Sequence, residues 1–210
     1  ALNQAFGPCP VVSPRRWPKF EGQHCDHLVT LVTEGIALPP LRGVGAISLF
    51  WRGGASDEPL ALVATTTATL RKGLADDCGT FPKGYDRWWN DVGHPRASSF
   101  ERGVSVRLER DDVPDDVIAD ALRCESGGFP EFPEEHEALM EELMEYSNFI
   151  GGFPNWIQGA ETPEQDDGSP AHFFMQLSGP SDLFGESKLG DADVFLFLTD
   201  DGTLISVGQS

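Results

Sequence analysis

The stretch HLVTLVT at residues 27–33 predicts a β-strand, because its branched and apolar residues alternate as strand residues do. AISLFWR at 46–52 follows it with the same character. Near the end of the chain, HFFMQL at 172–177 and VFLFL at 194–198 form a second such pair. Asp-Asp-Gly at 200–202 then predicts a hairpin turn into a last strand at 203–207. Further strands are predicted at 60–70 and 100–109.

The two strand pairs predict an internal duplication. In each pair a histidine opens the first strand, and a polar connector containing Gly and Pro leads to the second. An aromatic-Pro dipeptide precedes each pair, Trp17-Pro18 in the first case and Phe153-Pro154 in the second. A duplicated strand-loop-strand half explains this pattern, and chance similarity of two β-runs is the alternative.

Two acidic helices are predicted between the halves. The stretches PDDVIADALRC at 114–124 and PEEHEALMEELMEY at 133–146 each have Pro near the first turn and apolar residues at helical spacing. We therefore expect an α+β fold, a β-rich single domain over residues 1–210 with duplicated halves and inserted acidic helices. Its predicted segments are an extended Pro-rich opening at 1–22, a first β half at 23–109, the helical insert at 110–149 and a second β half at 150–210.

Charge narrows the classes of partner. The 210 residues carry 34 acids against 15 Lys and Arg, a formal net charge of −19. Such a chain repels the phosphates of nucleic acids and the head groups of anionic membranes, so a basic protein is the natural partner. No apolar stretch reaches the length that spans a bilayer, and no signal-peptide pattern is visible in the sequence given. The scattered cysteines, Cys9, Cys25, Cys78 and Cys124, read as buried or semi-buried reduced thiols, which predicts a cytoplasmic location.

The acids concentrate in one segment. Residues 109–145 hold 14 acids and two arginines, so they carry most of the excess charge. A solvated helix surface would also look like this, but like charges three or four residues apart destabilise a helix by roughly 0.2–0.5 kcal/mol per pair. We therefore predict that this segment binds a partner. The predicted contact residues are Glu134, Glu137, Glu141, Glu142 and Glu145, assisted by Asp115, Asp116 and Asp120.

Sites for chemistry are few. His24-Cys25-Asp26-His27 contains only potential zinc ligands, but neighbours in a strand point to opposite faces and no distant ligands are evident. The chain has no G-x-S-x-G elbow and no Walker lysine, and its histidines have no diagnostic neighbours. We expect no catalytic residue, no metal and no cofactor.

The run IGGFPNWIQ at 150–158 has two interpretations. In the structural one, the glycines form a sharp turn, the aromatic rings pack into the core and Gln158 bonds to backbone. In the functional one, Trp156 and Gln158 line a small pocket that faces Asp191. The structural interpretation is the simpler.

Several sequence patterns along the chain, including this run, resemble those of the YwqG-like family of bacterial proteins. The resemblance covers residues 17 to about 200 and rests on Trp17-Pro18, LPPL at 38–41, IGGFPNWIQ at 150–158 and Gly190-Asp191 before the strand at 194–198. The chain departs from the family pattern at Thr30, where the family usually has Gln, and at Ala192-Asp193, where it has Ala-Gly. The resemblance implies a cytosolic β-rich fold with internal duplication, and an association of some members with secreted toxins as immunity proteins.

Three hypotheses of function follow. The first is an immunity protein, not an enzyme. It binds a basic toxin, which we expect to be a nuclease, through its acidic segment and occludes the groove that binds phosphates. The second is a ligand-binding or enzymatic protein that uses the pocket between the halves. The third is a scaffold that self-associates through Trp88-Trp89 and the apolar residues of 129–132.

Overall fold

The computed structural model describes residues 2–36, 38–51, 60–85, 104–107, 148–178 and 193–209. Its contacts divide the chain into two compact units. Unit 1 consists of Ala1–Gly54 and Glu58–Leu108, and unit 2 consists of Ala55–Asp57 and Glu109–Ser210.

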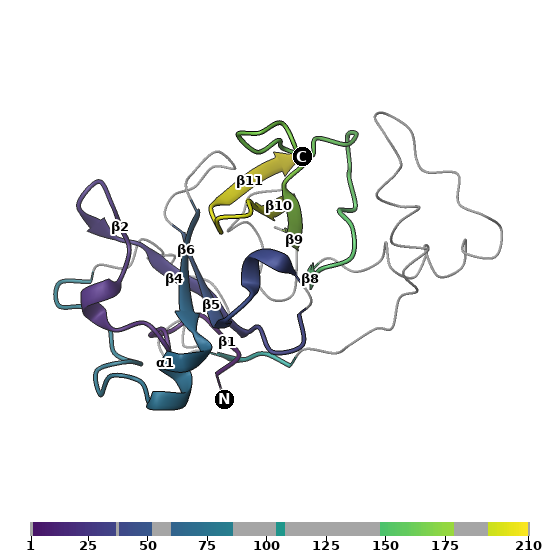
Figure 1. Ribbon diagram of the computed structural model, residues 1–210. Coiled ribbons are helices and arrows are strands. Elements are labelled where there is room, and N and C mark those ends of the chain that lie inside the picture. Colours follow the sequence, from purple (N-terminus) through teal and green to yellow (C-terminus); the bar gives the residue numbers. More distant parts are fainter. Residues whose placement is uncertain are drawn as a thin grey trace. The chain divides into compact units, whose positions relative to one another are not determined.

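Unit 1 is built on a five-stranded antiparallel sheet in the order β6-β5-β4-β1-β7 (Figure 1). Its strands are β1 (Gln4–Ala5), β4 (Asp26–Val32), β5 (Val44–Trp51), β6 (Leu60–Thr66) and β7 (Val104–Ser105). Smaller elements complete it, namely the hairpin of β2 (Lys19–Phe20) and β3 (Gln23–His24), the 3-10 turns η1 (Pro14–Arg16) and η2 (Pro39–Leu41), and the helix α1 (Thr67–Lys72).

The two central strands of unit 1 are buried on both faces. Strand β5 is buried from Gly45 to Trp51, and β4 is buried up to Leu31. On one face, Ala46 and Phe50 of β5 belong to a core cluster with Trp17 and with Cys9, Val11, Val12 and Cys25 from the connection between β1 and β4. The burial of both faces explains why HLVTLVT and AISLFWR contain so few charged residues.

Helix α1 begins where β6 ends. Thr66 is the N-cap, and its hydroxyl accepts a hydrogen bond from the Thr69 amide at 3.1 Å. Gly73 ends the helix with a φ of 107°, a conformation that glycine tolerates. The prediction of a single strand over 60–70 is therefore wrong after Thr66, because threonine hydroxyls favour caps as well as strands.

Unit 2 contains a four-stranded antiparallel sheet in the order β11-β10-β9-β8 (Figure 1). Its strands are β8 (Asn148–Ile150), β9 (His172–Ser178), β10 (Asp193–Leu198) and β11 (Leu204–Gln209). The predicted terminal hairpin is confirmed, since β10 and β11 pair along their whole length around a turn at residues 199–203.

The order of four strands is the same in both units. Strands β1, β4, β5 and β6 lie side by side in this order in the sheet of unit 1, and β8, β9, β10 and β11 do so in the sheet of unit 2. Every neighbouring pair is antiparallel. The first strand ends alike in both. Phe6 and Gly7 follow β1 with positive φ, and Gly151 and Gly152 follow β8 in the same way. The amide of Phe6 donates to a β4 carbonyl, and the amide of Gly151 donates to a β9 carbonyl, each at 2.8 Å.

The predicted α+β class is wrong. The described residues form antiparallel sheets, with α1 as their one α-helix and η1 and η2 as short 3-10 turns. The β-branched and aromatic runs pair with one another across both units, so sheet pairing, not helix packing, builds the described core. The two stretches at 114–124 and 133–146, on which the α part of the prediction rested, lie outside the described residues. The single domain over 1–210, with its four segments, stays a prediction.

Candidate functional site

The predicted partner surface lies outside the described residues. This applies to Glu134, Glu137, Glu141, Glu142, Glu145, Asp115, Asp116 and Asp120, and also to Asp191 of the predicted pocket. Trp156 and Gln158 are described, and both belong to the connection that leads from β8 to β9.

Trp156 packs against the sheet of unit 2. Its ring lies 4.5 Å from the ring of Phe195 and 5.9 Å from that of Phe197, measured between centroids. The amides of Ile157 and Gln158 donate to the side-chain oxygen of the buried Gln209 at 2.9 and 3.1 Å. The packing of Trp156 agrees with the structural interpretation of the run at 150–158, whereas the bond of the Gln158 side chain to backbone stays a prediction. The pocket stays a prediction.

The residues of the predicted polar cluster at 24–27 contact different neighbours. Asp26 accepts a short hydrogen bond from the Tyr85 hydroxyl, and the Cys25 carbonyl accepts one from the Trp17 indole at 2.6 Å. His27 points into the core of unit 1. Within the described ranges, no group of three or more His, Cys, Asp or Glu side chains is placed to hold a metal ion.

Four buried polar side chains in unit 1 form a hydrogen-bonded chain, which we call the thiol network. Its members are Cys9, His27, Thr30 and Ser48, each at most 3% exposed. The Cys9 thiol donates to the Ser48 hydroxyl at 3.2 Å and lies 3.4 Å from the Thr30 hydroxyl. Thr30 and Ser48 lie 2.8 Å apart, and Thr30 lies 2.8 Å from Nε2 of His27.

Strand register places these groups together. Thr30 of β4 is directly opposite Ser48 of β5, so both hydroxyls point to the same face of the sheet. A bulge between His27 and Val29 shifts the register, and the His27 ring reaches back toward Thr30. Cys9 comes from the connection that covers this face.

The direction of the hydrogen bonds follows from the carbonyls at one end. Nδ1 of His27 lies 3.1 Å from the Phe6 carbonyl and 3.2 Å from the Gly7 carbonyl, and because carbonyls only accept, Nδ1 carries a proton. In the neutral ring Nε2 then accepts from Thr30, which leaves Thr30 to accept from Ser48. The Cys9 proton thus has a continuous path to the imidazole.

The neighbours of Cys9 lower the pKa of its thiol despite its burial. Burial by itself raises the pKa of Cys9, but the neighbouring His27 imidazole and the hydroxyls of Ser48 and Thr30 outweigh it and lower the pKa to about 7. A thiolate is a nucleophile and a metal ligand, whereas a thiol is neither. Because Cys9 is fully buried, a molecule that reacts with it must reach it through the connection that covers it.

The sequence interpretation missed the thiol network. Cys9, His27 and Ser48 are separated by about twenty residues each, so no local motif joins them. The one signal is the presence of Thr30 and Ser48 in the middle of otherwise apolar strands, since a buried hydroxyl needs a partner.

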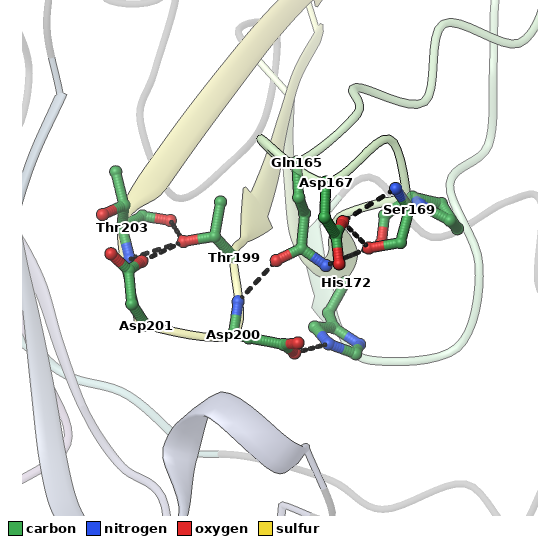
Figure 2. A network of polar contacts seen from close by, with 9 residues as sticks. Gln165, Asp167, Ser169, His172, Thr199, Asp200, Asp201 and Thr203 are labelled. Carbon is green, nitrogen blue, oxygen red and sulfur yellow. Dashed lines mark hydrogen bonds and ion pairs between the residues drawn. The ribbon is translucent and has the colours of Figure 1, made fainter.

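A second polar cluster lies at one end of the unit 2 sheet, where the connection before β9 meets the turn between β10 and β11 (Figure 2). We call it the loop network, and its members are Gln165, Asp167, Ser169, His172, Thr199, Asp200, Asp201 and Thr203. Gln165 accepts from the Asp200 amide at 2.7 Å, and His172 Nε2 lies 2.7 Å from an Asp200 carboxylate oxygen. These two contacts join the loops.

Two aspartates of the loop network are held in their charged form. The Ser169 hydroxyl and amide donate to Asp167 at 2.6 and 2.9 Å, and these bonds lower the pKa of Asp167. The Thr199 hydroxyl donates to Asp201, as does the Thr203 amide at 3.0 Å, and the pKa of Asp201 is lowered in the same way. Both carboxylates are exposed, so this end of the sheet presents negative charge to solvent.

No family model, no curated protein and no solved structure matches the chain. No helix among the described residues is both long and apolar enough to cross a membrane.

Proposed function

We propose that this chain is a cytoplasmic immunity protein that binds a basic toxin and blocks it. The observation that carries the proposal is the distribution of charge, because residues 109–145 alone hold 14 of the 34 acids. The choice of a toxin as partner rests on the resemblance to the YwqG-like family, and the choice of a nuclease rests on charge, since nucleases bind phosphates with basic surfaces.

Long-range electrostatics support a binding role for such a surface. A strong negative field attracts a basic partner from a distance and speeds its association, and added salt weakens this attraction. The described residues add to the field, because Asp167 and Asp201 are exposed and hydrogen bonds favour their ionised form. Neutralisation then needs no chemistry in this chain, since occupying the phosphate-binding groove of the toxin excludes its substrate.

The experiment is binding and growth rescue with the product of the adjacent gene. Glu141, Glu142 and Glu145 are changed together to Lys, and we expect both binding and rescue to be lost. The matched control changes Glu34, Asp76 and Glu161 to Lys, which alters the net charge equally at three exposed positions that lie outside residues 109–145 in the sequence. The control variant keeps rescue.

Calorimetry at increasing sodium chloride concentration tests the mechanism separately. We expect the affinity of the natural chain to fall steeply with salt, because exposed charges more than about 8–10 Å apart are screened at physiological ionic strength. Equal loss of binding in the two triple variants would show that net charge, not the acidic segment, attracts the partner. Intact rescue by the Glu141, Glu142 and Glu145 variant would overturn the assigned surface.

A further inference from the structure

A loop of unit 1 lies directly against Cys9. The Gly79 amide donates to the Cys9 carbonyl at 2.9 Å, and the Cys78 amide closes a turn onto the Ala75 carbonyl at 3.0 Å. Standard bond lengths then place the Cα atoms of Cys9 and Cys78 within roughly 8 Å of each other. Disulfides join Cα atoms roughly 4.4–6.8 Å apart, so the backbone of this loop lies at or near the distance that a disulfide between the two cysteines needs.

The two thiols differ in exposure and in acidity. Cys9 is fully buried in the thiol network, and Cys78 is partly exposed on the loop. Burial raises the pKa of Cys78, and the negative charges of Asp77 and Cys9 raise it further. The influence of Cys9 on the pKa of Cys78 agrees with the short separation that the backbone hydrogen bond sets.

We propose that Cys9 and Cys78 are a redox-modification site, a thiol pair that a low-molecular-weight disulfide converts reversibly into an internal disulfide. Cys78 is the thiol that meets the oxidant, because it is the exposed member of the pair. Cys9 is the internal nucleophile, because the hydroxyls of Ser48 and Thr30 lie within hydrogen-bond distance of its sulfur and favour the thiolate.

The conversion takes two exchange steps. The Cys78 thiolate attacks one sulfur of the small disulfide, forms a mixed disulfide and releases one small thiolate. The Cys9 thiolate then attacks the Cys78 sulfur, forms the internal disulfide and expels the second small thiolate. The two cysteines lose two electrons and two protons in total, and the small disulfide is reduced to two thiols.

The internal disulfide changes the core of unit 1. The Cys9 sulfur must turn from Ser48 toward the loop, so its hydrogen bonds within the thiol network are lost. The loop at 75–80 becomes covalently fixed to the connection between β1 and β4. Reduction by a small thiol reverses both changes.

The probe is glutathione disulfide, used on the full chain with Cys124 changed to Ser. Intact mass should show the loss of two hydrogen atoms, and tryptic mapping should join the peptide of Cys9 to that of Cys78. The Cys9→Ser variant should accumulate a glutathione adduct at Cys78, whereas the Cys78→Ser variant should stay unmodified at Cys9. Cys25→Ala is the matched control, because Cys25 is buried in the same core cluster as Cys9, and it should behave as the parent does.

The pH dependence identifies which thiol reacts first. If Cys78 does, the reaction should speed up about tenfold between pH 7 and 8, because the thiolate fraction of a thiol with a raised pKa grows in proportion to hydroxide. An increase of only about twofold would make Cys9 the first target and overturn the assigned order.

Three other results would overturn the proposal itself. They are a stable adduct at Cys78 in the parent without internal linkage, a linkage of Cys9 to Cys25, and no reaction at any thiol. Since Cys78 lies on an exposed loop, the comparison of the parent with Cys78→Ser decides the question even if Cys9→Ser fails to fold.

Discussion

Changing Thr30 to Val removes one hydroxyl from the centre of the thiol network and leaves the shape of the side chain almost unchanged. Thr30 is fully buried, and its hydroxyl lies 2.8 Å from both His27 Nε2 and Ser48 Oγ. The effect on stability is therefore polar, because no cavity is created. Ser48 keeps its contact with Cys9, but His27 Nε2 loses the partner that this hydroxyl provides.

The magnitude follows from these contacts. Each lost hydrogen bond costs about 0.5–1.5 kcal/mol, and a buried acceptor left without a partner costs about 1–3 kcal/mol. Allowing for overlap between these costs, we expect the free energy of unfolding of unit 1 to fall by about 2–4 kcal/mol. The pKa of Cys9 should rise at the same time, because the Thr30 hydroxyl that helps to lower it is gone.

Native-state hydrogen exchange measures this loss in one unit at a time. Peptides from β4 and β5 should exchange faster in the Thr30→Val variant, and peptides from β9 and β10 of unit 2 serve as the internal control. Thr33→Val is the comparison variant, because the Thr33 hydroxyl makes one hydrogen bond, to the Val44 carbonyl at 2.7 Å. A loss below about 0.5 kcal/mol for Thr30→Val, the scale of a neutral surface change, would refute the reasoning.

Three further predictions concern other parts of the two units. Gly45→Ala should destabilise unit 1 by about 1–3 kcal/mol in urea unfolding, because the new Cβ would lie 2.8 Å from the Thr67 Cα at the start of α1. Gln176→Ala should lower the free energy of unfolding of unit 2 by about 2–4 kcal/mol in the same measurement, because Gln176 is buried and its side chain accepts a hydrogen bond from the Asn155 amide at 3.0 Å. An unchanged unfolding midpoint would contradict this role. The pKa of Cys9 is lower in the folded chain than in the unfolded one, so the natural chain should gain roughly 2 kcal/mol of stability between pH 7 and 9 and lose it as the pH falls through 7. Hydrogen exchange at the two pH values measures this gain, and the Cys9→Ala variant should not show it.

The longer strands could be predicted from sequence, whereas among the short strands that the structure describes β7 alone falls within a predicted strand, the one at 100–109. Strands β4, β5, β9 and β10 begin and end within two residues of the runs that predicted them. Strand β1 has only two residues, and its partners come from residues 29–30 and 104–105, so no local pattern marks it. The Thr-rich run at 60–70 divides into strand and helix because one hydroxyl caps α1.

The residues of the candidate sites could likewise be predicted only where a local sequence pattern marks them. The glycines of the run at 150–158 predicted a turn, and Gly151 and Gly152 do adopt the positive φ values that a turn requires. The thiol network depends on strand register and on a bulge at His27, and neither can be read from residues that lie about twenty positions apart. Sequence patterns thus located elements, whereas contacts between distant elements created the chemistry.

The position of β1 has a consequence for how unit 1 is made. Of the described strands β1 is synthesised first, yet it lies between β4 and β7, and β7 is synthesised about a hundred residues later. A nascent chain on the ribosome therefore holds β1 without either neighbour until β4 emerges, and the sheet gains its last strand only when residue 105 has left the exit tunnel. Removing residues 4 and 5 would remove both of β1's ladders at once.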